Sequence, residues 1–223
     1  MQRSPITWPR MALPGVLVAV FAVLAMQWLW PLWTSGRAPG ARSGEAAAHI
    51  WGLVVASDGL TTHGPFLRVA DAALPAGIRR DLLDPVSLLV FTPVLRLTGS
   101  PAAAWGALGL SWMGVLAGGG VALGQRMGLG RLGTGVLAAA LLCAPYWQGG
   151  LLLMGRSEYW PWALWPLHLA MLHDGLHAET GRARLWGALW AALTLTMLTH
   201  GGWQPLVYVL PVQCCVALGM AWT

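Results

Sequence analysis

Residues 103–124 read AAWGALGLSWMGVLAGGGVALG, a run of 22 residues without a charged side chain. A helix of about 20 apolar residues is long enough to cross the hydrocarbon core of a bilayer. Gly114 and Gly118, and then Gly120 and Gly124, are spaced four apart within this run. Because small residues at this spacing let two helices approach closely, we expect a membrane-spanning helix that packs tightly against its neighbours.

The composition of the whole chain also indicates a membrane protein. Of the 223 residues, 57% are hydrophobic and 9% are charged, whereas soluble domains are about one quarter charged. All 13 basic residues are scattered arginines, so the net charge of +5 forms no basic stripe and nucleic acid is not an expected partner. Cys143, Cys214 and Cys215 lie in apolar runs without CxxC spacing, which argues against a disulfide framework or a zinc site.

Further apolar runs extend the pattern to about six spans; they are 12–33, 132–145, 159–172, 185–199 and 206–222. A cleaved signal sequence is the alternative for the first run, but its length and terminal tryptophans favour a retained helix. The shorter run 86–97 contains Pro93 and Arg96 and is expected to lie at the membrane surface. The predicted fold class is therefore all-α, a polytopic transmembrane helical bundle with a helical extracytoplasmic first loop.

The arginines predict the orientation of this bundle. With a cytoplasmic amino terminus and a non-spanning 86–97, the pairs Arg126–Arg131 and Arg182–Arg184 fall in cytoplasmic loops, as the positive-inside rule requires. The chain then divides into an amino terminus with the first helix (1–33), an extracytoplasmic loop with juxtamembrane helices (34–102) and five further spans (103–223). The expected location is the inner (plasma) membrane, crossed several times, with the active side extracytoplasmic.

The same orientation sorts the acids and the aromatic residues. Six of the eight acids fall outside: Glu45, Asp58, Asp71, Asp81, Asp84 and Glu158. Residues 45–56 are expected to be helical because their alanines favour a helix, so Glu45 and His49 share one face. Many tryptophans also collect at the outer helix ends, where we interpret them as an aromatic belt at the membrane interface: Trp28, Trp30, Trp33, Trp105, Trp147, Trp160, Trp162 and Trp203.

Several local motifs follow one another in a recognisable order. They are Glu45 with His49, Ile50 and Trp51; Leu74 to Gly77; Asp84-Pro85; Gly99 to Gly106; Ala144-Pro145-Tyr146; and Gly155, Glu158 and Trp165-Pro166-Leu167. In this order the chain resembles the amino-terminal part of GT-C class membrane glycosyltransferases. These enzymes take sugars from polyprenyl-phosphate donors on the extracytoplasmic face. Family members usually carry an aspartate where this chain has Glu45, and they are usually longer, so a fragment or a shortened member is expected.

The resemblance implies a set of roles at the outer face. It makes Glu45 the candidate general base, since an acceptor hydroxyl must lose its proton as it attacks the anomeric carbon, with His49 beside it and Asp58 as a further catalytic candidate. Arg156 is the candidate phosphate contact, and Glu158 and His200 are the other candidate substrate-binding residues. The substrate would be a polyprenyl-phosphate sugar, and positive charge or a divalent metal would stabilise the leaving phosphate. No metal-ligand motif is present in the sequence.

Structural interpretations of the same residues remain open. Glu45 is also typical of an acid at a helix start, and Asp58 before Gly59 is typical of a turn. The structural interpretation of Arg156 and Glu158 is an ion pair within a loop. Among functions, a non-catalytic scaffold or assembly subunit that packs a membrane-protein partner against its glycine faces is the main alternative. A transporter is the other, indicated only by His168 inside a predicted span.

Overall fold

A computed structural model describes residues 12–39, 44–63, 85–145, 147–148 and 157–199 of the chain. All regular structure within these ranges is helical. The elements are α1 (Ala12–Ser35), α2 (Gly44–His63), α3 (Pro85–Thr98), α4 (Pro101–Arg126), α5 (Arg131–Cys143), the 3-10 helix η3 (Ser157–Leu164), α6 (Trp165–Leu176) and α7 (Gly181–Thr199). The predicted all-α class is therefore confirmed for the described part of the chain.

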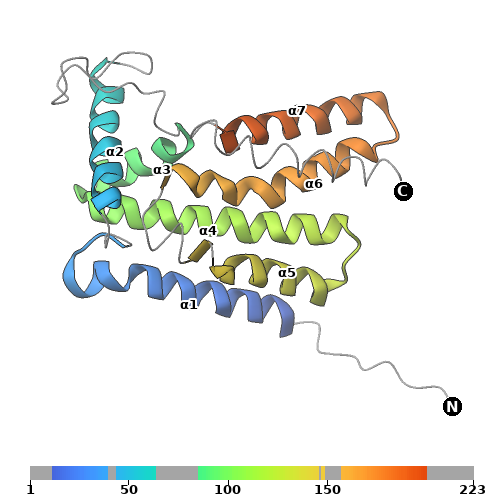
Figure 1. The fold of residues 1–223 in the computed structure, drawn as a ribbon, viewed down its shortest axis with the longest axis horizontal. Coiled ribbons are helices and arrows are strands. Elements are labelled where there is room, and N and C mark those ends of the chain that lie inside the picture. Colours follow the sequence, from blue (N-terminus) through green and yellow to red (C-terminus); the bar gives the residue numbers. More distant parts are fainter. Residues whose placement is uncertain (1–11, 40–43, 64–84, 146, 149–156, 200–223) are drawn as a thin grey trace.

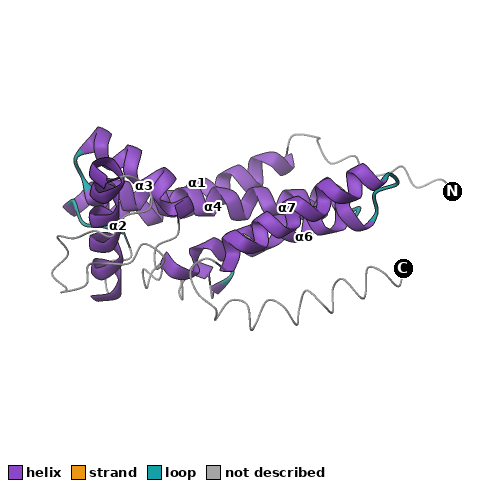
Figure 2. Ribbon diagram, turned by 90° about the horizontal axis from the view of Figure 1, so that it is seen from above, coloured by secondary structure: helices purple, strands orange, loops and turns teal. Residues whose placement is uncertain are grey.

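Helix α4 is the centre of the arrangement. Figure 1 shows α1 and α5 along one side of α4 and α6 and α7 along the other, with α2 standing across one end of these long helices beside α3. Seen from above in Figure 2, α2 and α3 again lie together at one end. Helix α4 contacts α1, α2, α3, α5, η3 and α6. The bundle therefore has two distinct ends, one built on α2, α3 and the start of α4, and one built on the α4–α5 and α6–α7 connections.

Local sequence explains where α4 begins and ends. Ser100 is the N-cap, and its side-chain oxygen accepts a hydrogen bond from the backbone N–H of Ala103 (3.2 Å). Pro101 occupies the first helical position, where its fixed φ suits the helix and its missing N–H costs nothing. After Arg126 the chain turns through Gly128, whose φ of +69° is available to glycine at no steric cost.

Two helices among the described residues are long and apolar enough to cross a membrane, the segments Leu17–Ser35 of α1 and Pro101–Arg126. Both agree with predicted spans. The predicted count of about six is not confirmed, because α5 has 13 residues and α6 has 12, and at 1.5 Å per residue each reaches only about 20 Å of a core about 30 Å thick. The predicted run 206–222 lies outside the described residues.

Two boundaries differ from the sequence prediction. Helix α2 continues to His63, so the Asp58-Gly59 pair expected to form a turn is helical. Packing explains this extension: the Ser57 hydroxyl donates to the hydroxyl oxygen of Thr92 in α3 (2.8 Å), and the tertiary contact outweighs local propensity. The predicted span 159–172 instead begins inside η3, which contains Pro161, and becomes α-helical only at Trp165. A proline inside the segment removes one backbone donor, and the tighter 3-10 turn accommodates it.

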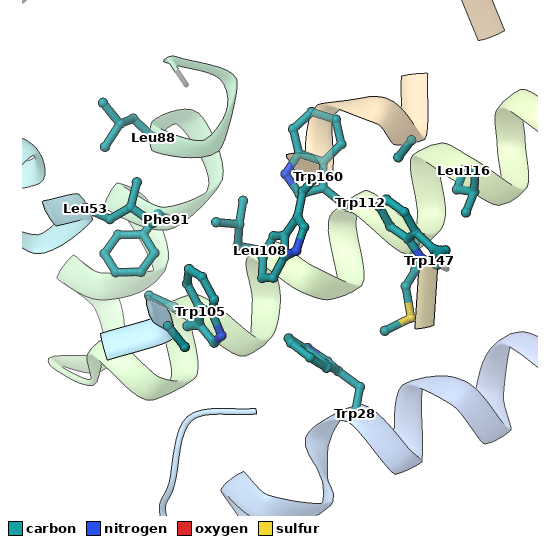
Figure 3. Packing of buried hydrophobic residues seen from close by; sticks show 14 of the residues in the cluster. Trp28, Leu53, Leu88, Phe91, Trp105, Leu108, Trp112, Leu116, Trp147 and Trp160 are labelled. Atoms are coloured by element: carbon teal, nitrogen blue, oxygen red, sulfur yellow. The ribbon is translucent and has the colours of Figure 1, made fainter. Parts of the chain in front are cut away.

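The tryptophans correct a second prediction. Four of the eight tryptophans predicted for the belt are at most 5% exposed and belong to one core together with Trp112: Trp28, Trp105, Trp147 and Trp160. Trp30 and Trp33 are 61% and 59% exposed, as the prediction requires. Figure 3 shows the buried rings between α1, α4 and the segments that precede α6. The Trp160 ring lies 4.5 Å from that of Trp105 and meets Trp28 edge-on at 5.8 Å. Aromatic pairs in such geometries stabilise a core beyond the area they bury.

The glycines of α4 fall into two groups. A Cβ atom on Gly120 would lie 2.9 Å from the Cα of Ala138, and one on Gly124 would lie 3.0 Å from the Cα of Thr134, so this pair brings α5 close to α4 as predicted. Gly114 and Gly118 have nothing within 4 Å of the same position. Gly114 and Gly118 therefore form an open strip on α4.

Candidate functional site

The chain between α1 and α2 is held at one end of the bundle by a hydrogen bond across a long sequence separation. The chain leaves α1 through Gly36, whose φ is +65°, and reaches Pro39. The Pro39 carbonyl accepts a buried hydrogen bond from the indole N–H of Trp105 near the start of α4 (2.8 Å). Because a buried carbonyl without a partner costs free energy, this contact fixes the chain at Pro39, five residues ahead of α2.

Helix α2 presents one packed face and one exposed face. Ala46, Leu53 and Ala56 are buried at helical spacing, whereas Trp51 is 47% exposed. His49 is half-buried, at the edge of the packed face. Glu45 is the second residue of α2, and a spacing of four places position 45 on the same side as His49. The predicted helical relation between Glu45 and His49 is therefore present in the backbone.

Asp58 lies away from this pair. It follows His49 by nine residues, about two and a half helical turns, so it occupies the opposite face of α2, and it is about 20 Å along the axis from Glu45. Its carboxylate accepts a hydrogen bond from Nη2 of Arg96 in α3 (3.0 Å), and the two side chains are 65% and 50% exposed. The structure thus brings Asp58 to a surface ion pair and does not bring it together with His49.

The segment η3 reaches the same end of the bundle from far along the sequence. Glu158 is in its first turn. Trp160 follows two residues later, is fully buried, and packs on Trp105 at 4.5 Å. One tryptophan of α4 therefore contacts both the chain leading to Glu45 and the helix carrying Glu158. Arg156 and His200, the other predicted substrate-binding residues, lie outside the described residues.

Sequence reasoning missed this anchoring role of Trp105. The available signal was that Trp105 and Trp112 lie within an apolar helix and are spaced seven apart, which places them on one face. The indole N–H groups of Trp112 and Trp147 are buried and have no hydrogen-bond partner in the part of the chain that the structure describes. Each is a donor that a water or a substrate oxygen would satisfy.

Polar groups also meet at the opposite end of the bundle. Arg126 at the end of α4 binds Asp174 near the end of α6 through both Nε and Nη2, at 3.0 to 3.2 Å. His173 and His177 stack one turn apart with ring centroids 4.2 Å from each other. Within the described ranges no group of three or more His, Cys, Asp and Glu side chains is placed to hold a metal ion.

His168 is the histidine expected inside a span. It is buried in α6, its ring stacks on that of Trp165 at 5.8 Å, and it interacts with the backbone of Ala191 in α7. Its environment is therefore a contact between neighbouring helices. Such a contact is a structural role, and it adds nothing to the transporter alternative.

No protein-family model, curated protein or solved structure matches this chain.

Proposed function

We propose that this protein is a membrane glycosyltransferase that transfers a sugar from a polyprenyl-phosphate donor to an acceptor at the extracytoplasmic face. The observation that supports this proposal is the double contact of Trp105, which holds the chain leading to Glu45 and the η3 segment carrying Glu158 at one end of the bundle. The helix ends that carry Arg126, Arg131 and Arg182 are at the other end.

The proposed orientation follows from that separation. Positive residues accumulate in cytoplasmic loops, so the α4–α5 and α6–α7 connections are cytoplasmic and α2 is extracytoplasmic. Helix α1 then leads outward and α4 returns inward, which their opposite directions in the bundle allow. In this proposal the described helices form a bundle that crosses the plasma membrane several times.

The proposed reaction uses Glu45 as the general base. As the acceptor hydroxyl oxygen attacks the anomeric carbon, its proton passes to the carboxylate, the bond between that carbon and the phosphate oxygen breaks, and the polyprenyl phosphate leaves with inversion. His49, one turn away, orients the base. Arg156 stabilises the negative charge on the leaving phosphate, since a guanidinium matches phosphate oxygens.

The remaining candidates have subordinate roles in this proposal. Glu158 and His200 contact the sugar or the acceptor. Asp58, paired with Arg96 on the opposite face of α2, stabilises the contact between α2 and α3 and takes no part in proton transfer. A divalent metal at the leaving phosphate remains an alternative to Arg156 as the source of positive charge.

The test is turnover of radiolabelled polyprenyl-phosphate sugars by the purified full chain in lipid nanodiscs. Wild type is compared with Glu45→Gln and with Asp58→Asn, two neutral replacements of similar size on the same helix. Loss of a general base lowers the rate by about 10²- to 10⁴-fold. We expect a loss of that size for Glu45→Gln and less than about a threefold change for Asp58→Asn, because an exposed ion pair contributes little.

The outcomes separate the class from the site. If Glu45→Gln retains wild-type turnover, the protein is a glycosyltransferase but Glu45 is not its general base. If the folded wild type consumes none of a panel of donors that differ in sugar, the class itself is wrong.

A second candidate function is a scaffold that packs a partner membrane protein. The open strip at Gly114 and Gly118 favours it, because small residues at this spacing receive a second helix and nothing in the described part of the chain covers them. The scaffold requires Gly118→Leu to abolish a partner contact in membranes while Glu45→Gln has no effect on function. The glycosyltransferase proposal requires Glu45→Gln to abolish function while Gly118→Leu leaves it unchanged.

A further inference from the structure

A groove lies at the end of the bundle opposite to α2, between α1, α4 and α5. Its volume is about 420 Å³, which is within the range of about 300 to 1,000 Å³ typical of small-molecule sites. Its lining comes from three helices and the connection between α4 and α5: Leu17 of α1, Val121 and Gln125 of α4, Leu129 of the connection, and Arg131, Thr134 and Gly135 of α5. None of these residues belongs to the proposed catalytic end.

The groove has an apolar wall and a polar mouth. Leu17 and Val121 form the deeper apolar part, each about five residues, or roughly 8 Å, from the end of its helix, and Leu129 adds an apolar side chain beyond the end of α4. Gln125 and Arg131 are exposed near the helix ends. In a helix that spans a bilayer this spacing puts the polar groups at the headgroup level and the apolar wall in the upper acyl region.

Among the described residues, the charge at the mouth is positive and has no carboxylate partner. The neighbouring Arg126 is neutralised by Asp174, whereas no described carboxylate pairs with Arg131. Arg131 is also the first residue of α5, and the N-cap Gly130 supplies no side-chain hydrogen bond to the first-turn N–H groups. The positive end of the helix dipole therefore adds to the guanidinium charge at the same point.

We propose that this groove binds one anionic phospholipid, with an acyl chain along Leu17 and Val121 and the phosphate at Arg131. The combination of an apolar slot with a basic rim between membrane helices fits an anionic lipid. Gln125 donates its amide to the headgroup oxygens, and the lipid bridges α1 to α5. The proposal depends on membrane insertion of α1 and α4 and is independent of the glycosyltransferase proposal.

Native mass spectrometry of the full chain in detergent tests the site, with phosphatidylglycerol and phosphatidylcholine of identical acyl chains as probes. We expect Arg131→Gln to weaken phosphatidylglycerol binding about fivefold, the effect of one arginine near a charged lipid, and to leave phosphatidylcholine unchanged. Arg182→Gln is the matched control, because Arg182 is an exposed arginine at the same end of the bundle but outside the groove. It should leave both lipids unchanged.

A second variant tests the slot itself. Gly135→Leu places a side chain in the groove and should lower the binding of both lipids, and glycerophosphoglycerol, the headgroup without chains, should not compete. Equal losses in Arg131→Gln and Arg182→Gln would show general surface attraction and overturn the site. Unchanged binding in Arg131→Gln, or competition by the chain-free headgroup, would overturn it as well.

Discussion

Replacing Gly109 by alanine should disrupt the tryptophan core of the bundle. A Cβ atom at position 109 would lie 2.5 Å from Cζ2 of the Trp28 ring, closer than real Cβ atoms approach any heavy atom. Trp28 is 4% exposed, and its indole N–H donates to the Gly106 carbonyl at 3.0 Å. The ring cannot move aside without losing that hydrogen bond and its edge-on contact with Trp160.

The magnitude follows from three terms. Forcing an extra methyl group into a packed core costs about 1 to 3 kcal/mol, and leaving a buried donor without its acceptor costs about 1 to 3 kcal/mol. Replacing glycine by alanine in a helix returns about 0.5 to 1 kcal/mol. The net destabilisation is about 1 to 5 kcal/mol, and for a chain of this size it lowers Tm by about 2 to 20 °C. Because packing rather than hydrophobic burial holds helices together in a membrane, we expect this loss of packing to lower the stability of the bundle directly.

The assay is thermal unfolding in detergent, followed by tryptophan fluorescence. Gly114→Ala is the matched control, because Gly114 is on the same helix and has nothing within 4 Å of its Cβ position. Its Tm should be unchanged or slightly higher. Trp28→Phe should partly relieve Gly109→Ala, with a coupling of about 1 kcal/mol in a double-mutant cycle. Equal Tm values for the two alanine variants, or additive losses in the cycle, would refute the proposed packing.

Three further outcomes are expected. Asp174→Asn should lower the free energy of unfolding by about 1 kcal/mol or less, because the Asp174 side chain is 41% exposed and that of Arg126 is 34% exposed. Exchanging the two residues should restore the wild-type Tm, and a failure to restore it would contradict a direct pair. Trp105→Phe should speed backbone hydrogen exchange at residues 36–38 by about five- to tenfold, because it removes the hydrogen bond from the Trp105 indole to the Pro39 carbonyl. Unchanged exchange would contradict this role of Trp105. Gly120→Val should lower Tm where Gly118→Val does not, since only the first meets the backbone of α5; similar shifts would contradict this difference.

Hydropathy was sufficient to predict the long helix α4. The uncharged run 103–124 specifies this helix by its length and its lack of charge, and the Ser100-Pro101 start was found only in the structure. The short α3 was also predicted, because Pro93 and Arg96 break its apolar run. Local signals failed for α2. Asp58-Gly59 is typical of a turn, but Ser57 packs against Thr92 of α3 and the helix runs to His63.

Contacts between distant segments could not be predicted. Hydropathy does not distinguish a tryptophan at a membrane interface from one in a protein core, because the ring is amphipathic in both. Trp105 belongs to the core, where its indole N–H donates to the carbonyl of Pro39, a residue 66 positions earlier in the chain. The relation of Glu45 to His49 was predictable from a spacing of four on one helix. The separation of Asp58 from them depends on α2 being continuous, which only the structure provides.

The orientation of the two ends of the bundle is the claim on which the proposed reaction depends. It is measured by labelling single cysteines with a membrane-impermeant maleimide in right-side-out vesicles, after Cys143, Cys214 and Cys215 are replaced by serine. Ala47 of α2 and Met127 after α4 are both exposed and mark opposite ends. We predict that Ala47→Cys is labelled in sealed vesicles and Met127→Cys only after the vesicles are opened. Labelling of Met127→Cys in sealed vesicles with Ala47→Cys protected, or labelling of both from the same side, would contradict an extracytoplasmic site at Glu45.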